Sequence, residues 1–94
     1  EIEGPALILF YTDNWVPWQQ FAPIVNGIEQ EFTGRANVIR LNVDDPENEH
    51  IQQSYGVRGH PSVVILDAAG QVSERFFGEV ATETLREALN TVTQ

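Results

Sequence analysis

The sequence predicts a small α/β domain, and three observations carry that prediction. A continuous apolar run, Ala6 to Tyr11, shows no alternation of polar and apolar residues, which is typical of a strand buried on both faces. From Pro17 to Phe32, apolar residues recur at spacings of three and four, the period of an amphipathic helix. A second strand pattern, Asn37 to Val43, follows that helix. Strand, helix and strand in succession predict a βαβ unit whose two strands run parallel.

The second half of the chain predicts two further strands and two further helices. Asp45 is expected to cap a short helix that has Pro46 at its first position. Val63 to Leu66 is a third strand pattern, and a tight glycine-containing connection follows it. Residues 72–77 should therefore return as an antiparallel neighbour of that strand. Thr82 is expected to cap a last amphipathic helix.

Composition excludes several classes of function. The 94 residues carry fourteen Asp and Glu against five Arg and no Lys, a net charge of −9, which repels nucleic acid and anionic lipid and favours a monomer. No apolar stretch approaches 18 residues, so the segment should not insert into a membrane. There is no cysteine, which rules out disulfides, thiolate catalysis and zinc–thiolate sites for this chain.

The extent of the chain predicts one domain. Ninety-four residues suffice for a single core, so we expect residues 1–94 to form one unit. The absence of methionine leads us to expect a piece of a longer or processed protein. Any targeting or anchoring segment would then lie outside it, and the compartment stays open.

Several spaced motifs carry a family resemblance. They are Tyr11-Thr12-Asp13-Asn14-Trp15-Val16-Pro17-Trp18, then Pro23 six residues past Pro17, then Tyr55-Gly56-Val57-Arg58-Gly59-His60-Pro61-Ser62, then Gly70 and Gly78. In order and separation they resemble the thioredoxin family, from about Ala6 to Leu89. The resemblance implies a thioredoxin fold: an α/β domain with about four strands in a mixed sheet flanked by three helices. The family's usual first strand and helix would be largely absent, and Pro23 would kink the first helix.

The resemblance also implies what the chain has lost. Trp15 and Trp18 occupy the positions of the family's two redox cysteines, Pro17 that of the motif proline and Pro61 that of the cis-proline. Neither the attacking nor the resolving thiolate of disulfide exchange is therefore present. No catalytic residue and no cofactor is expected for the chain as written.

A further departure concerns proton handling. The family's buried acid, which assists the second thiol, falls at Leu9 here, and its basic neighbour falls at Arg40. An aliphatic side chain cannot carry a proton, so Leu9 removes a second part of the redox machinery.

The first functional hypothesis is therefore a redox-inactive domain that binds extended polypeptide or a partner protein. An indole beside the cis-proline would offer a large stacking surface and an N–H donor, and the residue before that proline can pair through its backbone with a peptide strand. The expected binding residues are Trp15, Val16, Pro17, His60, Pro61, Gly78, Glu79 and Val80. Packing alone remains an alternative explanation for the two tryptophans, and an ordinary loop position for His60.

Two other functions stay open. The chain could be a natural or engineered variant of a thiol–disulfide oxidoreductase that has lost its Cys-x-x-Cys motif, or a structural module of a longer protein. The acidic stretch near Asp45 lacks calcium-loop spacing, so we interpret Asp44, Asp45, Glu47, Glu49 and His50 as a solvated helix start and expect no metal site.

Overall fold

The computed structural model describes residues 2–14, 18–57 and 62–94, with the backbone alone for Trp18. Its elements in order are β1 (Ala6–Tyr11), α1 (Trp18–Glu31), β2 (Asn37–Asn42), a 3-10 turn η1 (Pro46–Asn48), α2 (Glu49–Ser54), β3 (Ser62–Leu66), β4 (Val72–Phe77) and α3 (Thr82–Thr93). The predicted four strands and three helices are confirmed. No helix among these residues is long and apolar enough to cross a lipid bilayer.

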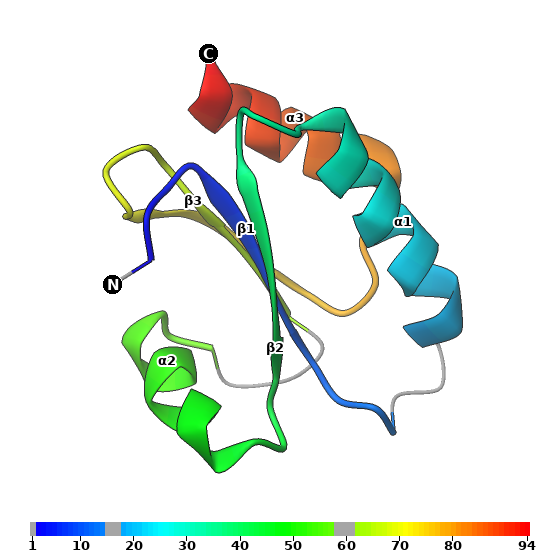
Figure 1. The fold of residues 1–94 in the computed structure, drawn as a ribbon, viewed down its shortest axis with the longest axis vertical. Coiled ribbons are helices and arrows are strands. Elements are labelled where there is room, and N and C mark those ends of the chain that lie inside the picture. The colour runs from blue at the N-terminus through cyan, green and yellow to red at the C-terminus, as the bar shows by residue number, and fades with distance from the viewer. Residues whose placement is uncertain (1, 15–17, 58–61) are drawn as a thin grey trace.

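The four strands form one mixed sheet in the order β2-β1-β3-β4 (Figure 1). β1 and β2 are parallel, as a βαβ unit requires, while β3 runs antiparallel to both β1 and β4. Both predicted strand relations are therefore confirmed. Strand β1 is central, and β2 and β4 are the two edges.

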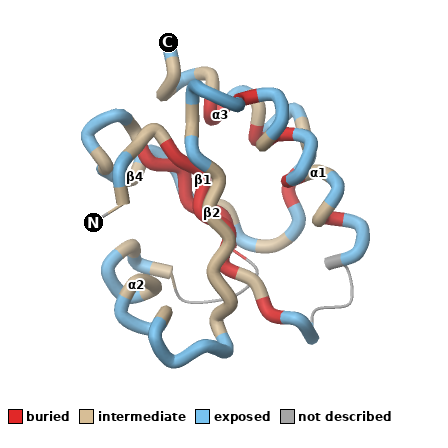
Figure 2. Tube along the Cα trace, viewed as in Figure 1, coloured by how far each residue is buried: buried red, intermediate tan, exposed pale blue. Residues whose placement is uncertain are grey.

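Alternation along the central strands divides the core into two layers. Leu7 and Leu9 of β1 point into a cluster with the apolar faces of α1 and α3, whereas Ile8 and Phe10 point into a second cluster partly covered by α2. Successive side chains of a strand face opposite sides of the sheet, so one apolar run supplies both clusters. Figure 1 shows α1 and α3 on one side of the sheet and α2 on the other, and Figure 2 shows the buried residues concentrated on the central strands.

Helix α1 follows the predicted apolar stripe. Phe21, Val25 and Ile28 are fully buried, as is Phe32 just past its last residue. Pro23 lies inside the helix on its exposed side, and the helical assignment continues through it. A kink at this position stays a prediction.

The two predicted helix caps have different outcomes. Asp45 is the N-cap of η1, where its carboxylate accepts a hydrogen bond from the Glu47 backbone N–H at 3.0 Å, as predicted. The prediction that Thr82 caps the last helix is wrong. Ala81 holds that position in an extended conformation, and its carbonyl accepts from Leu85 N at 3.2 Å. Because Val80 is already packed in the core, the chain becomes helical one residue earlier than the side-chain pattern suggests.

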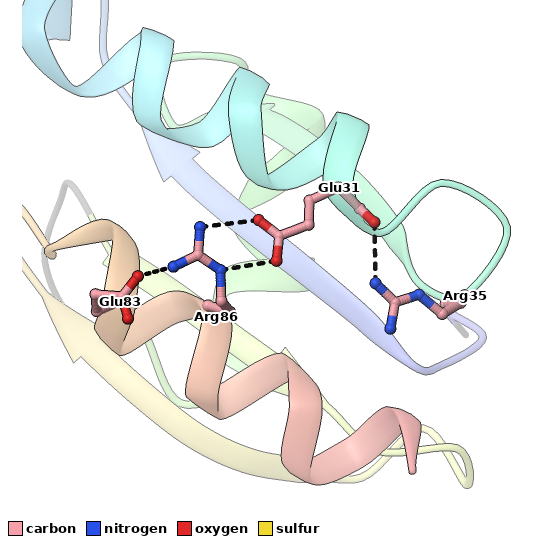
Figure 3. Close-up of polar contacts among 4 residues, drawn as sticks. All are labelled: Glu31, Arg35, Glu83 and Arg86. Carbon is pink, nitrogen blue, oxygen red and sulfur yellow. Dashed lines mark hydrogen bonds and ion pairs between the residues drawn. The ribbon is translucent and has the colours of Figure 1, made fainter.

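An ion pair between Arg86 and Glu31 connects α3 to α1 (Figure 3). Arg86 donates two hydrogen bonds to the Glu31 carboxylate, Nε to Oε2 at 2.7 Å and Nη2 to Oε1 at 3.0 Å, and its third nitrogen pairs with Glu83. Arg35 donates to the Glu31 backbone carbonyl at 2.9 Å. The hydrogen bond from Arg86 lowers the pKa of the Glu31 carboxyl, and the same bond raises the pKa of Arg86.

We predict that Glu31→Gln lowers the melting temperature at pH 7 but not at low pH. The lowered pKa of Glu31 means that its contribution to stability is present above the unfolded-state pKa and is lost as the pH falls from about 5 through the folded-state value. Salt at about 1 M should also shrink the difference, because both partners are solvent-accessible. Thermal melts of both proteins across pH measure this. Glu87→Gln, an exposed acid on α3, is the matched control, and a deficit that persists unchanged near pH 2 would refute the assignment.

Candidate functional site

The register of the sheet brings three strand ends together at one end of the sheet. Phe10 pairs with Ser62, and Ser62 pairs in turn with Phe77, so the end of β1, the start of β3 and the end of β4 lie in one row. On the other side of β1, Tyr11 pairs with Asn42 at the end of β2. Residues 12–14, Ser62 and residues 78–80 therefore lie at this end of the sheet. The predicted site consists of residues 78–80 and of residues that follow Asn14 or precede Ser62 in the sequence.

Five of the predicted site residues, Trp15, Val16, Pro17, His60 and Pro61, lie outside the described residues. Predictions about the two tryptophans as a stacking surface, and about Pro61 as a cis-proline, stay predictions. Trp18 begins α1, in agreement with a motif placed at the start of a helix. The frame around these positions is described on every side, by residues 12–14, Trp18, Val57 and Ser62.

The turn at residues 78–80 is the described part of the site. Gly78 has φ +88°, and apart from its chain neighbours no atom of the described residues lies within 4 Å of where its Cβ would be. Glu79 is exposed, whereas the Val80 side chain is only 7% exposed and belongs to the core. Val80 therefore anchors the turn, and only its backbone remains for a ligand.

A polar network that the sequence analysis missed holds the turn after β1 to the loop after β2. The buried Thr12 hydroxyl donates to Asp44 Oδ2 at 2.7 Å and accepts from the Asn14 N–H at 3.5 Å. Asn42 Nδ2 donates to Asp13 Oδ2 at 3.3 Å, and its Oδ1 accepts from Asp44 N at 2.8 Å. The signal was present, because polar residues follow two parallel strands whose ends share one edge. This network orients the chain that enters the tryptophan motif.

At Leu9 the core contains an aliphatic side chain where the family resemblance implies a buried acid. Leu9 is fully buried in the cluster under α1 and α3, and its strand partner is Arg40. Arg40 donates to Asn26 Oδ1 at 2.7 Å and to Glu29 Oε1 at 2.9 Å, so its charge is directed toward α1. The basic side chain is thus engaged with the helix, and Leu9 offers no proton-carrying group beside it.

The described part of the chain contains no set of side chains that could bind a metal ion. Within residues 2–14, 18–57 and 62–94, no three His, Asp or Glu side chains lie where they could share one ion. Asp45 uses its carboxylate to cap η1, and Asp44 accepts from Thr12. These acids therefore have structural partners in the loop that connects β2 to α2.

Comparisons with known proteins agree with this fold. The family model for thioredoxin matches residues 1–91. The chain is 35% identical over 91 residues to thioredoxin from Synechocystis sp., covering 93% of this chain and 78% of that protein. Among solved structures, a single-substitution mutant of thioredoxin from Halobacterium salinarum NRC-1 superposes with a TM-score of 0.81 at 30% identity, covering 95% of this chain and 74% of that one. An uncharacterized thioredoxin-like protein from Clostridium perfringens shares the fold, with a TM-score of 0.84 at 20% identity, over 98% of this chain and 73% of that one.

The fold and the register of its strand ends thus define a thioredoxin-fold domain with a degenerate motif. The chain belongs to the thioredoxin family. It is a member without cysteine, which fits replacement of the motif cysteines by Trp15 and Trp18.

We predict that Thr12→Val destabilises the domain by about 1–2 kcal/mol, because it removes a buried hydroxyl that donates to a carboxylate. Thr12→Ser keeps the hydroxyl and is the matched control, with a smaller loss. Denaturant unfolding measures both. Faster amide hydrogen exchange at Asn14 in the Val variant is expected as well, and equal stability of the two variants would contradict a role for the hydrogen bond.

Proposed function

We propose that this domain binds extended polypeptide at the motif end of the sheet and performs no thiol–disulfide exchange. The observation that carries the proposal is the complete absence of cysteine from a chain of the thioredoxin family. Without a thiolate, neither attack on a disulfide nor resolution of a mixed disulfide is possible. What remains of the site is its shape, its backbone groups and two indoles.

The register of the strands supports this binding site. The ends of β1 and β4 and the start of β3 form one row. The tryptophan motif, the His60-Pro61 segment and the Gly78 turn are next to these strand ends in the sequence. Apart from its chain neighbours, no described residue crowds Gly78, which favours close approach of a ligand main chain there. An extended peptide could pair its backbone beside Pro61 and stack a side chain on Trp15.

We predict that a cysteine-free extended peptide, titrated to about 2 mM, shifts the Trp fluorescence and the amide resonances of Gly59, His60 and residues 78–80. Trp15→Ala should weaken that response about tenfold or more, because aromatic anchors dominate such contacts. Glu87→Gln on α3 serves as the control. If neither indoles nor these amides respond, the binding proposal is wrong.

The rival function is an oxidoreductase that has lost only its sulfurs, and it is favoured by relatives that are themselves thioredoxins. We predict that Trp15→Cys combined with Trp18→Cys restores disulfide reduction only weakly. Leu9 leaves proton transfer unassisted, so the rate should lie about 10²-fold below that of an intact thioredoxin. Insulin reduction measures this, and full activity would show that Leu9 is no barrier and favour the oxidoreductase.

A further inference from the structure

A groove lies beside edge strand β4, on the face of the sheet that carries α2. Its volume is about 400 Å³, and its lining is Gly56, Val57, Ser62, Val64, Arg75, Phe76 and Phe77. That volume lies within the range of ligand-binding clefts. Among the described residues no further strand pairs with the outer edge of β4, because β4 ends the sheet order. An apolar groove and an unpaired strand edge therefore lie next to each other.

From Glu74 to Phe77, the side chains of β4 face the two sides of the sheet alternately, and each side receives one charged residue and one phenylalanine. Arg75 and Phe77 pair with Val64 and Ser62, so both lie on the α2 face. Glu74 and Phe76 pair with Ile65 and Val63, which places them on the face of α1 and α3. Phe77 is 74% exposed, the one large hydrophobic side chain so exposed among the described residues. Nothing in the core requires an aromatic ring there.

Arg75 is held in place by a backbone carbonyl. Its Nε donates to the Tyr55 carbonyl at 2.8 Å, and a Cβ on Gly56 would lie 3.3 Å from its Nη2. Among the described residues no carboxylate forms an ion pair with it, unlike Arg40 and Arg86. The guanidinium is therefore held through Nε, and Arg75 forms part of the lining of the groove.

We propose that the outer edge of β4 binds an extended segment of a partner protein as an added antiparallel strand. Directly opposed residues share a face, so the segment should place a carboxylate opposite Arg75, a basic side chain opposite Glu74 and an apolar one opposite Phe77. Read from its N-terminus, this segment is apolar, any residue, acidic, basic. The ladder between β3 and β4 is regular from Phe77 to Glu74, and the bulge lies beyond it. The surface adjoins the proposed peptide site, because Phe77 directly precedes Gly78 in the sequence.

The charges of β4 argue against a second copy as the occupant. When two copies of β4 pair antiparallel about a two-fold axis, each residue must lie opposite a residue that is an even number of positions away in the sequence. An odd separation would place the two opposed side chains on different faces of the sheet. The two registers centred on the middle of the strand then oppose Glu74 to its own copy or Arg75 to its own copy. Like charges directly opposed are destabilising. Each copy also carries a net charge of −9.

The test uses two short peptides of identical composition and net charge. Acetyl-Ser-Leu-Val-Glu-Lys-Thr-amide matches the proposed register, and acetyl-Ser-Leu-Val-Lys-Glu-Thr-amide exchanges its two charges. In titrations of the full chain to about 2 mM peptide, we expect amide shifts at residues 72–77 and about five- to tenfold tighter binding of the matched peptide. Equal affinity, or no response of β4, would overturn the proposal.

Variants of β4 separate the alternatives. Glu74→Arg combined with Arg75→Glu should reverse the preference between the two peptides, because the preference follows the strand charges. Phe77→Ser should weaken both peptides, with Glu87→Gln as control. Shifts confined to the indoles and the amides of Gly59 and His60 would overturn this proposal and leave the proposed function standing. Dilution-dependent shifts at β4 without peptide would assign the edge to a second copy and also overturn it.

Discussion

The fold depends on one constraint, which is that β1 is buried on both faces and paired on both edges. Its neighbours are β2 and β3, and its alternating side chains fill two separate apolar clusters. A one-residue slip of either neighbour would turn that neighbour's side chains to the wrong face. The helices are therefore needed on both sides of the sheet, and α1 and α3 must be held together on one of them. The ion pair between Arg86 and Glu31 holds the two helices together at the surface, and the apolar cluster holds them together in the core.

The same constraint sets the end of the sheet at which the proposed site lies. Because Phe10, Ser62 and Phe77 are in register, the ends of β1 and β4 and the start of β3 lie in one row. The hydrogen bond from Thr12 to Asp44 then sets the path of the chain that leaves β1. The chain contains no cysteine and has this arrangement of strand ends all the same. The frame around the proposed site therefore does not depend on cysteines.

Most of the fold could be predicted from the sequence, because each element has its own period. The apolar run of β1, the stripe of α1 and the Asp45-Pro46 start are local patterns, and all three are confirmed. Features set by distant residues were not predictable. The Thr82 cap failed because burial of Val80 decides where α3 begins, and the Glu31–Arg86 pair joins positions 55 residues apart. At the candidate site, the sequence could name Gly78 and Val80 as neighbouring residues of one segment, but only packing shows that the Val80 side chain is buried.

Phe77 shows how the two proposed surfaces relate. Its neighbour Phe76 packs against the core while Phe77 is exposed, since adjacent residues of a strand face opposite sides. The aromatic pair therefore spans both faces at the last two positions of β4, directly before Gly78. In a polypeptide that pairs antiparallel to β4, the residues that precede the partner of Phe77 lie beside Gly78. One extended polypeptide of sufficient length could then occupy the β4 edge and continue into the motif end of the sheet. In that case the two sites would bind a single partner with additive contacts, and short peptides would bind each of them weakly.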